Sequence, residues 1–438
     1  MYTLAINNAV IVSRNYGYVP FIGSICVQDT DIAEIRRGPV SESECGEWID
    51  GSNKILMPGL VNCHNHGDMT LARGLGDDLT LLEQIRAYSS HNWFYDFITD
   101  EERYNARQLA YCEALLCGTT FICENMYWGL GLRSIDAMKE TGIKGALVED
   151  IRFDFSNSDS FVADETLREF SAACKNAGLV PVIGLPAEED FETERLQKIF
   201  AKLQGIDALQ TLHLAENQWR VDIIKQKYGM TPIEYLSRNG LLHERLIGSH
   251  VVFANEKEIG LLKEAHVRIA NTPLCEMKIA DGIAPIPEMT RQGLTLGLGT
   301  DGALWNNSSD IFREMKGTAL LHTVNSGIRC LSKNNILDMA TAGGAAVFGK
   351  EAEFGLIQQG MKADMILIDT NKPHLQPLVT ENHENVSSAI IFSASGRDVS
   401  DVFINGKRIV KNGTLTTVNV SEIIDKVRKT AQKIAEKM

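Results

Sequence analysis

Residues 58–66 read PGLVNCHNH, a short apolar run that ends in two histidines separated by one residue. Side chains two residues apart point to the same side of an extended strand, so His64 and His66 can face one ion together. The stretch therefore predicts a buried strand whose tip carries two imidazoles.

Seven further short apolar runs follow, and helix-length amphipathic segments separate them. This alternation is the signature of βα units around a parallel sheet. The eight runs are 58–64, 119–124, 144–150, 180–186, 209–215, 246–251, 267–272 and 294–301. Eight such units predict an α/β fold, a (β/α)8 TIM barrel over residues 58–360.

The two ends of the 438-residue chain read differently from its middle. Residues 3–13, 21–27 and 48–57 are strand-like, as are 360–369, 389–394 (AIIFSA) and 399–413, while 421–438 form an amphipathic helical pattern. Because the ends of a barrel can meet on its outside, we expect residues 1–57 and 361–438 to form one composite β-sandwich domain with a C-terminal helix.

Composition and charge narrow the function classes. Hydrophobic residues make up 44% and charged residues 23%, which is typical of a globular protein. The formal charge of −14 and the scattered basic residues argue against a nucleic-acid partner. Nine cysteines without a Cys-x-x-Cys pair indicate reduced thiols, and no apolar run is long enough to cross a membrane. No signal-peptide pattern begins the sequence, so a cytoplasmic enzyme is expected.

Metal-binding residue types gather where the predicted strands end. His213 ends the fifth run and Asp301 the eighth, beside His64 and His66 of the first. The carboxyl ends of barrel strands meet at one face, where active sites of such barrels lie. Three imidazoles and one carboxylate suit a divalent ion such as zinc or iron and leave room for a water molecule.

Two further residues near these strand ends suggest proton chemistry. Glu216 lies three residues after His213, so a bend past the strand tip brings its carboxylate over the barrel mouth. We expect Glu216 to transfer protons. The alternative is a structural role, because an acidic residue in the first turn of a helix is stabilised by the helix dipole. His250 ends the sixth run and is expected to hydrogen-bond the activated water; a core histidine bonded to backbone is the alternative.

The same residues belong to longer motifs that resemble a known family. These motifs are PGLVNCHNHGDMTLARGLGDD, HLAE, GSHVVF, NTPLCEMKIADGIAPIPEM and LGTDGALWNN. Together they resemble the amidohydrolase superfamily, in the branch of methylthioadenosine/S-adenosylhomocysteine deaminases, guanine deaminases and triazine hydrolases. The resemblance covers nearly the whole chain, including the KADMILID strand that closes the family's β-sandwich. It implies metal ligands at His64, His66, His213 and Asp301, with Glu216, His250 and Asp301 in catalysis.

The resemblance also bears on the number of ions. Binuclear members of the superfamily bridge two ions with a carboxylated lysine at the end of strand four, where this sequence reads VPVIGLPAEED without a lysine. One divalent ion, zinc ahead of iron, is therefore expected. The missing Pro-Cys-x-x-Cys element excludes the separate cytidine-deaminase-like zinc fold.

Departures from the family pattern concern the substrate. Trp93 falls near the position where adenosine-type members carry a ribose-binding glutamate, and only Arg152 is close to where a carboxylate-binding arginine belongs. Cys275 follows strand seven in Asn271-Thr-Pro-Leu-Cys in place of the usual Asn-Pro-x-Ser-Asn. Trp93 and Trp305 near the mouth suggest stacking on a flat ring; packing at the surface is the alternative.

The implied reaction is hydrolytic removal of an exocyclic amine, as ammonia, from a purine-, adenosine- or pterin-like heterocycle. Removal of chloride or an alkylamine from a triazine-like ring is the enzymatic alternative. An inactive binding protein with this fold is the alternative from another class. A small-molecule partner, no nucleic acid, no membrane and a homo-oligomer (dimer or tetramer) complete the expectations.

Overall fold

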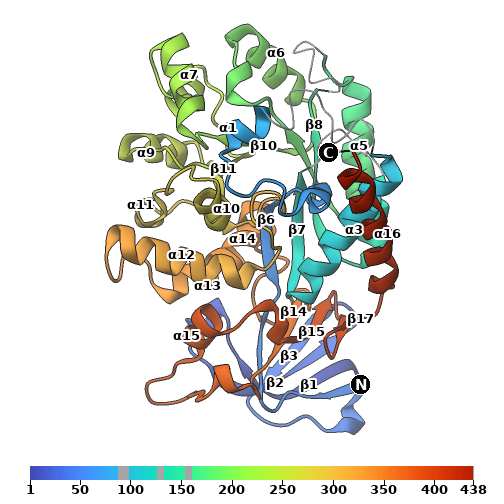
Figure 1. The fold of residues 1–438 in the computed structure, drawn as a ribbon. Helices are drawn as coiled ribbons and strands as arrows, with labels where there is room; N and C mark the ends of the chain where they lie inside the picture. Colours follow the sequence, from blue (N-terminus) through green and yellow to red (C-terminus); the bar gives the residue numbers. More distant parts are fainter. Residues whose placement is uncertain (87–97, 126–132, 153–159, 438) are drawn as a thin grey trace.

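The computed structural model describes residues 1–86, 98–125, 133–152 and 160–437. It consists of two sheets and the helices around them, with the eight-stranded barrel and the nine-stranded mixed sheet at opposite ends of the molecule (Figure 1). Trp93 lies outside the described residues.

Eight parallel strands form the barrel sheet, and every predicted run supplies one of them. In chain order they are β6 (Leu60–Asn65), β7 (Thr119–Asn125), β8 (Lys144–Asp150), β9 (Val180–Gly184), β10 (Leu209–Leu214), β11 (Leu246–His250), β12 (Arg268–Asn271) and β13 (Leu296–Leu298). Each strand pairs with its neighbours in the chain. The ends of the sheet meet where the backbone N–H groups of Thr300 and Asp301 donate to the carbonyl of His64, over 3.1 and 2.9 Å. The predicted TIM barrel is confirmed.

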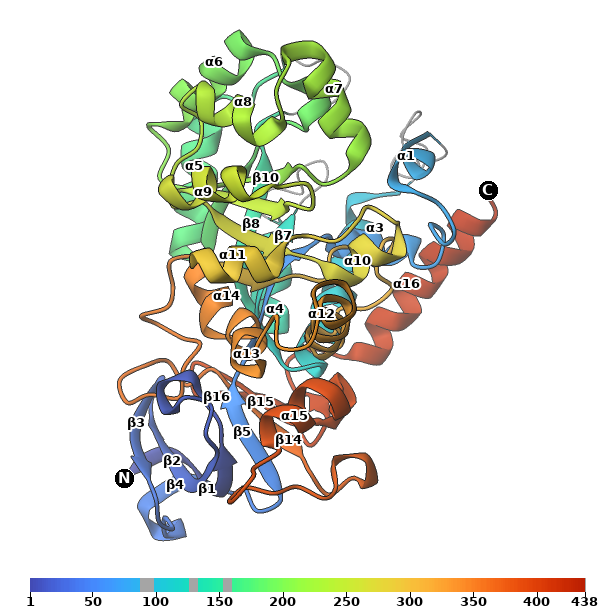
Figure 2. The same cartoon turned by 90° about the vertical axis from the view of Figure 1, so that its left-hand side faces the viewer.

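Helices cover the outside of this barrel (Figures 1 and 2). Several begin at a side chain that caps their first turn. For example, the Asn255 side chain accepts from the backbone N–H of Glu258, and the Glu258 carboxylate accepts from the backbone N–H of Asn255. The helices are α1 (Leu81–Gln84), α3 (Asp100–Leu116), α4 (Arg133–Thr141), α5 (Asp164–Asn176), α6 (Thr193–Leu203), α7 (Gln218–Tyr228), α8 (Pro232–Arg238), α9 (Glu256–Glu264), α10 (Pro273–Lys278), α11 (Ile286–Gln292), α12 (Ile311–Ser326), α13 (Lys333–Ala340) and α14 (Ala342–Val347).

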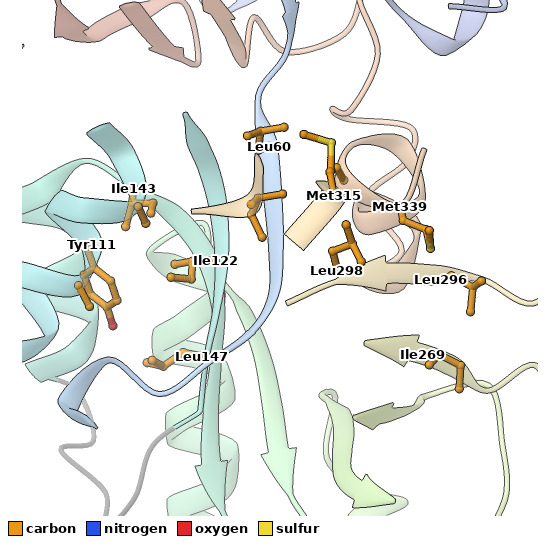
Figure 3. Packing of buried hydrophobic residues seen from close by; sticks show 14 of the residues in the cluster. Leu60, Tyr111, Ile122, Ile143, Leu147, Ile269, Leu296, Leu298, Met315 and Met339 are labelled. Carbon is orange, nitrogen blue, oxygen red and sulfur yellow. The ribbon is translucent and has the colours of Figure 1, made fainter. Parts of the chain in front are cut away.

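Alternate strand residues form two apolar clusters, as the two-residue period of a strand requires. Figure 3 shows the outer cluster, in which Leu298 of β13 lies near Met315 of α12 and Met339 of α13. A second cluster joins Val61, Phe121 and other strand residues to Phe348 and Phe354, which follow α14. Packing on both faces of the strands fixes their tips rigidly.

The mixed sheet combines both ends of the chain. Its strands are β1 (Tyr2–Ile11), β2 (Phe21–Gln28), β3 (Asp31–Arg36), β4 (Cys45–Asp50), β5 (Lys54–Pro58), β14 (Met365–Asp369), β15 (Val399–Ile404), β16 (Lys407–Lys411) and β17 (Thr414–Leu415). β5 and β14 join the halves through an antiparallel ladder that pairs Lys54–Pro58 with Asp369–Met365. The composite domain from both termini is thus present, while its division from the barrel at 57/58 and 360/361 stays a prediction.

Two details differ from, or add to, the expectations at the C-terminal end. Residues 389–394 are not a strand: Ala389–Ser393 form a π-helical turn after α15 (Val386–Ser388), which buries Ala389, Ile390 and Ile391. The apolar run was misread because one buried helical turn and a short buried strand look alike in sequence. The C-terminal helix α16 (Val420–Ala435) lies along α3 of the barrel, where Lys433 pairs with Glu102 at 2.8 Å (Figure 2).

Within the described residues, no helix combines the length and the apolar character needed to cross a membrane.

Candidate metal centre and catalytic site

The predicted strand-end residues converge at the carboxyl end of the barrel. The ring of His64 lies 5.0 Å from that of His66, 4.9 Å from that of His213 and 5.1 Å from that of His250, centre to centre. The Nε2 atoms of His64 and His66 are 3.8 and 3.7 Å from Oδ1 of Asp301. Residues that are up to 237 positions apart in sequence, His64 and Asp301, thus share one site.

Left-handed backbone conformations turn three of these strand ends over the mouth. Ala215, which precedes Glu216, has φ of 48°, His250 has 67° and Asp301 has 61°. Side chains other than glycine rarely adopt such angles, which cost of order 1–3 kcal/mol each and gather at functional sites. At these positions the turn directs Glu216, His250 and Asp301 toward the centre of the mouth.

Two overlapping groups of side chains in the described residues fit a metal ion. One is His64, His66 and Asp301 and the other is His64, His213 and His250, with ligand atoms within 4.8 Å of one another in each group. Burial lowers the pKa of His64 and of His66 well below the ordinary value, so both rings are neutral and offer lone pairs at pH 7. The buried Nε2 of His64 has no hydrogen-bond partner among the described residues. A divalent ion fits this donor set.

The other nitrogen of His64 has neighbours that orient its ring. Oγ of Ser249 lies 3.0 Å from Nδ1 of His64, and the Asn125 amide lies 3.1 Å from it. When Nε2 binds a metal, Nδ1 carries the ring proton and donates a hydrogen bond to Oγ of Ser249, while the Asn125 amide donates to the carbonyl of Asn65. Ser249 is the residue before His250 on β11, so one strand supplies both a support for His64 and a catalytic candidate.

His250 is held from behind by the segment that follows β12. Its Nδ1 lies 2.8 Å from Oγ1 of Thr272 and 3.8 Å from Oε1 of Glu276. Its Nε2 lies 3.8 Å from Oε1 of Glu216. Burial alone lowers the pKa of His250, but the negative charges of Glu216 and Glu276 raise it to about 9. The ring is therefore a proton carrier placed between two carboxylates.

Glu216 is bound by an arginine one helical turn further on. Arg220 of α7 donates to Oε2 of Glu216, and its Nε donates to Glu189 over 2.8 Å. Burial alone raises the pKa of Glu216, but the charges of His250 and Arg220 outweigh burial and lower it below the ordinary value. Glu216 is 3% exposed and ionised, so it can accept a proton inside the site.

Asp301 is fixed by two donors. The thiol of Cys275 donates to Oδ2 over 3.0 Å, and the backbone N–H of Gly302 donates to Oδ1 over 2.6 Å. Burial raises the pKa of Asp301 to about 6. Cys275, predicted as a substrate contact, is fully buried beside this carboxylate.

A buried charge cluster supports the segment of the two first histidines. Glu124 accepts from the Asn65 side chain over 2.7 Å and from the Gly67 backbone over 2.8 Å. Arg107 of α3 lies between Glu124 and Asp68, 3.4 Å from each carboxylate. Because Asn65 and Gly67 flank His66, the cluster fixes the path of the chain through the candidate ligands.

The remaining predicted substrate residues lie in different surroundings. The Trp305 ring stands edge-on to that of His66 at 5.3 Å, and its Nε1 is buried with no hydrogen-bond partner among the described residues. Trp305 thus lies beside a candidate metal ligand. Arg152 is buried and donates to Asp190 over 2.6 Å. Trp93 belongs to the residues that the structure does not describe.

The residues that support the candidate ligands and proton carriers were not predicted from the sequence. These are Ser249, Asn125, Thr272, Glu276, Arg220, Glu124 and Arg107. Arg220 alone had a usable signal, since it lies four residues after Glu216 and such pairs are neighbours on a helix. Taken together, the site offers neutral imidazoles and a carboxylate for a metal, an ionised glutamate, and a histidine that can carry a proton. This set of residues is suited to metal-assisted hydrolysis.

Comparisons with known proteins agree with that chemistry. A model of the amidohydrolase family matches residues 55–409. A 5'-deoxyadenosine deaminase of Methanopyrus kandleri is 34% identical over 402 residues, which cover 89% of this chain and 90% of the relative. A 5-methylthioadenosine/S-adenosylhomocysteine deaminase of Syntrophomonas wolfei is 32% identical over 421 residues, 95% of each chain.

Solved structures share the fold. An adenosine deaminase from Xanthomonas campestris with bound zinc superposes with a TM-score of 0.89 at 25% identity and covers 99% of both chains. The atrazine chlorohydrolase from Arthrobacter aurescens, complexed with zinc, has a TM-score of 0.86 at 19% identity, with 98% of this chain and 100% of that chain covered. At that identity the second likeness concerns the fold alone.

Proposed function

Since the chain belongs to the amidohydrolase family, we propose that it is a metal-dependent hydrolytic deaminase of an aminated nitrogen heterocycle, purine-, adenosine- or pterin-like. The relatives at 32% and 34% identity are named deaminases of adenosine-type compounds and align over nearly their full length. The observation that carries the proposal is the convergence of His64, His66, His213 and Asp301 with Glu216 and His250 at one barrel mouth.

We assign one divalent ion, zinc ahead of iron, to His64, His66, His213 and Asp301. Neutral imidazoles and a carboxylate are borderline ligands that zinc favours, and the Xanthomonas campestris relative was solved with zinc. An ion bound there lowers the pKa of water and makes it a nucleophile at neutral pH. The lack of a lysine at the end of β9 supports a single ion.

Glu216 is the proposed proton shuttle. Arg220 keeps its carboxylate ionised and fixed, so Glu216 can accept a proton from the attacking water. It then delivers that proton to the ring nitrogen beside the reacting carbon. His250, whose Nε2 lies 3.8 Å from Oε1 of Glu216, is the second proposed proton carrier.

His250 and Asp301 complete the proton transfers. Thr272 and Glu276 set the orientation of the His250 ring, so that Nε2 faces Glu216 and the reaction centre. Asp301, held by Cys275 and Gly302, assists proton delivery to the departing ammonia. The reaction then consumes water and heterocycle and releases ammonia and the corresponding lactam.

Substrate contacts are proposed from position. Trp305, edge-on to His66 at 5.3 Å, is suited to stack on or cap the ring. Arg152 and Trp93 remain predictions for the outer part of the substrate, and Cys275 acts through Asp301. A cytoplasmic homo-oligomer, dimer or tetramer, also remains a prediction.

The hydrolysis of a triazine-like ring is the second candidate. It has in its favour the fold shared with the atrazine chlorohydrolase, at 19% identity. The deaminase relatives are more similar in sequence, which favours amine removal. An inactive binding protein is disfavoured because the four proposed ligands, Glu216 and His250 are all present in the sequence.

A panel of aminopurines, adenosine-type nucleosides, aminopterins and chloro- or alkylaminotriazines tests the proposal. The purified protein should contain close to one zinc or iron per chain and release ammonia from at least one aminated ring. Release of chloride or alkylamine without ammonia would favour the triazine reaction, and metal-loaded protein that turns over none of these rings would refute the deaminase.

A further inference from the structure

The segment between α10 and α11 lies over the loop that follows His250. It follows β12 and therefore belongs to the same end of the barrel as the candidate site. A side-chain carbon on Gly282 would stand 2.7 Å from Cγ1 of Val252, so only glycine allows this close approach. The preceding Ala280 has a left-handed φ of 59°, and the backbone N–H of Asp281 donates to the carbonyl of Glu276 over 3.0 Å. These constraints fix Asp281 beside Glu276 and the loop that follows His250.

The Asp281 side chain is 8% exposed, and its buried Oδ2 has no hydrogen-bond partner in the described part of the chain. Burial raises the pKa of Asp281 to about 8, and the charge of Glu216 is the next largest cause. His250 and Glu276 also act on this carboxyl group. The loop that Gly282 contacts leads back to Glu216, because the backbone N–H of Phe253, next to Val252, donates to the carbonyl of Ala215 over 3.0 Å, and Ala215 precedes Glu216. Asp281 therefore lies on the Glu216 side of the site.

The other three carboxyl groups around His250 all have partners. Glu216 is bound by Arg220, Glu276 accepts from Asn271 and Thr272, and Asp301 accepts from Cys275 and Gly302. A buried oxygen without a partner is costly and calls for a ligand, a water molecule or a functional reason. Among these four, only Asp281 has a fully buried carboxyl oxygen without a hydrogen-bond partner in the described residues.

We propose that Asp281 is a specificity-determining residue that binds the heterocycle, accepting an N–H from an amino group on the ring carbon next to the nitrogen that Glu216 protonates. This inference rests on the proposed deaminase function. Glu216 contacts the ring nitrogen beside the reacting carbon. A carboxyl group next to Glu216 therefore contacts the substituent on the next ring carbon, beyond that nitrogen. Carboxyl oxygens accept such a bond whether or not the group is protonated.

The substrate class is therefore a ring with two amino groups, of which one leaves and one is retained. Adenine has no donor at the second position. A diamino ring carries an amino group on the carbon beside the protonated nitrogen, and the product of its deamination retains this amino group. Purines, pterins and triazines can all carry two such amino groups. Asp281 therefore selects substrates by the retained amino group and not by the type of ring.

The test compares ligands that differ by this amino group alone. Turnover of 2,6-diaminopurine and adenine, and of their ribosides, gives one ratio of kcat/KM. Binding of guanine and hypoxanthine, and of their ribosides, to the metal-loaded protein by calorimetry gives a second ratio that does not depend on turnover. We expect the amino compound to be favoured roughly ten-fold in both, the effect of one hydrogen bond to a carboxyl group.

Asp281→Ala should bring both ratios close to one, with unchanged metal content and circular dichroism, whereas Asp222→Ala on the exposed surface of α7 should leave them as in the wild type. If Asp281→Ala fails to fold, Asp281→Asn keeps the shape and a weaker acceptor, and should reduce both ratios in part. Equal ratios in wild type and Asp281→Ala would overturn the role of Asp281 while leaving deamination intact. A wild type that deaminates none of these rings would overturn the proposed function, and this inference with it.

Discussion

The thiol of Cys275 lies 3.0 Å from Oδ2 of Asp301 and donates a hydrogen bond to it, although the residues belong to different βα units. With Oδ2 held in this way, Oδ1 faces the Nε2 atoms of His64 and His66 at 3.8 and 3.7 Å. The cysteine thereby orients a proposed ligand without being a ligand. A donor of this kind is what the outer layer of a metal site supplies.

Cys275→Ala should accordingly weaken metal binding by about 10–100-fold, the usual effect of losing a partner behind a ligand. Cys275→Ser keeps a donor of similar size and should remain within a few-fold of the wild type. Competition with a chromophoric chelator measures both affinities. If alanine and serine leave the affinity equally unchanged, Cys275 is a packing residue only.

Glu216→Gln keeps the shape of the side chain but removes the group that titrates. We expect kcat to fall by at least ~10²-fold, which is the contribution typical of a general acid–base residue, with the metal content preserved. Glu194→Gln, an exposed change on α6, is the matched control and should have no effect. Near-normal turnover of Glu216→Gln would assign the proton transfers to His250 or Asp301.

The barrel and the residues at its strand tips were predictable from the sequence for local reasons. Each strand is a short apolar run, and His64, His66, His213 and Asp301 lie at or next to the end of such a run. Since the strand tips of a barrel meet at one face, local position was enough to bring distant residues together.

The groups that hold these residues have no local signal. Ser249 is 185 residues from His64, and Arg107 reaches Glu124 and Asp68 from a helix outside the barrel. A serine in a strand or an arginine in a helix is ordinary in sequence, so only the assembled structure identifies its partner. The same holds for Asp281, whose significance depends on an oxygen left without a partner.

The buried cluster of Arg107, Glu124 and Asp68 should be sensitive to loss of its cation. Arg107→Met leaves two buried carboxyl groups without their positive neighbour and should lower the free energy of unfolding by about 3–5 kcal/mol. Arg133→Met breaks the exposed pair with Glu101 and should cost about 1 kcal/mol or less. Urea unfolding of both variants measures the difference. Equal free energies of unfolding for the two variants would mean that water reaches the cluster, or that Glu124 and Asp68 take up protons without a cost in stability.

Asp401 of β15 joins the two halves of the mixed sheet. Its buried carboxylate accepts from Lys54 of β5 over 2.9 Å and from Arg408 of β16 over 2.8 Å. Burial alone raises the pKa of Asp401, but the hydrogen bonds from Ser400, Lys54 and Arg408 outweigh it and lower the pKa. A carboxyl group whose pKa is lower in the folded state stabilises the fold above its unfolded pKa of about 3.9. That contribution is lost as the pH falls through the folded pKa.

Asp401→Asn should therefore destabilise the protein by about 3 kcal/mol at pH 7, because it leaves Lys54 and Arg408 without their charged partner. The difference from the wild type should shrink as the pH falls below about 4, because the unfolded wild-type chain takes up a proton there while the folded carboxylate stays ionised until its own lower pKa is reached. Asp369→Asn, at a partly exposed pair with Lys372, is the control and should change stability little at any pH. Urea unfolding between pH 7 and pH 3 gives both curves. A difference between Asp401→Asn and the wild type that stays constant down to pH 3 would show that the loss comes from packing rather than from charge, and that the ionised carboxylate does not join the two halves of the sheet.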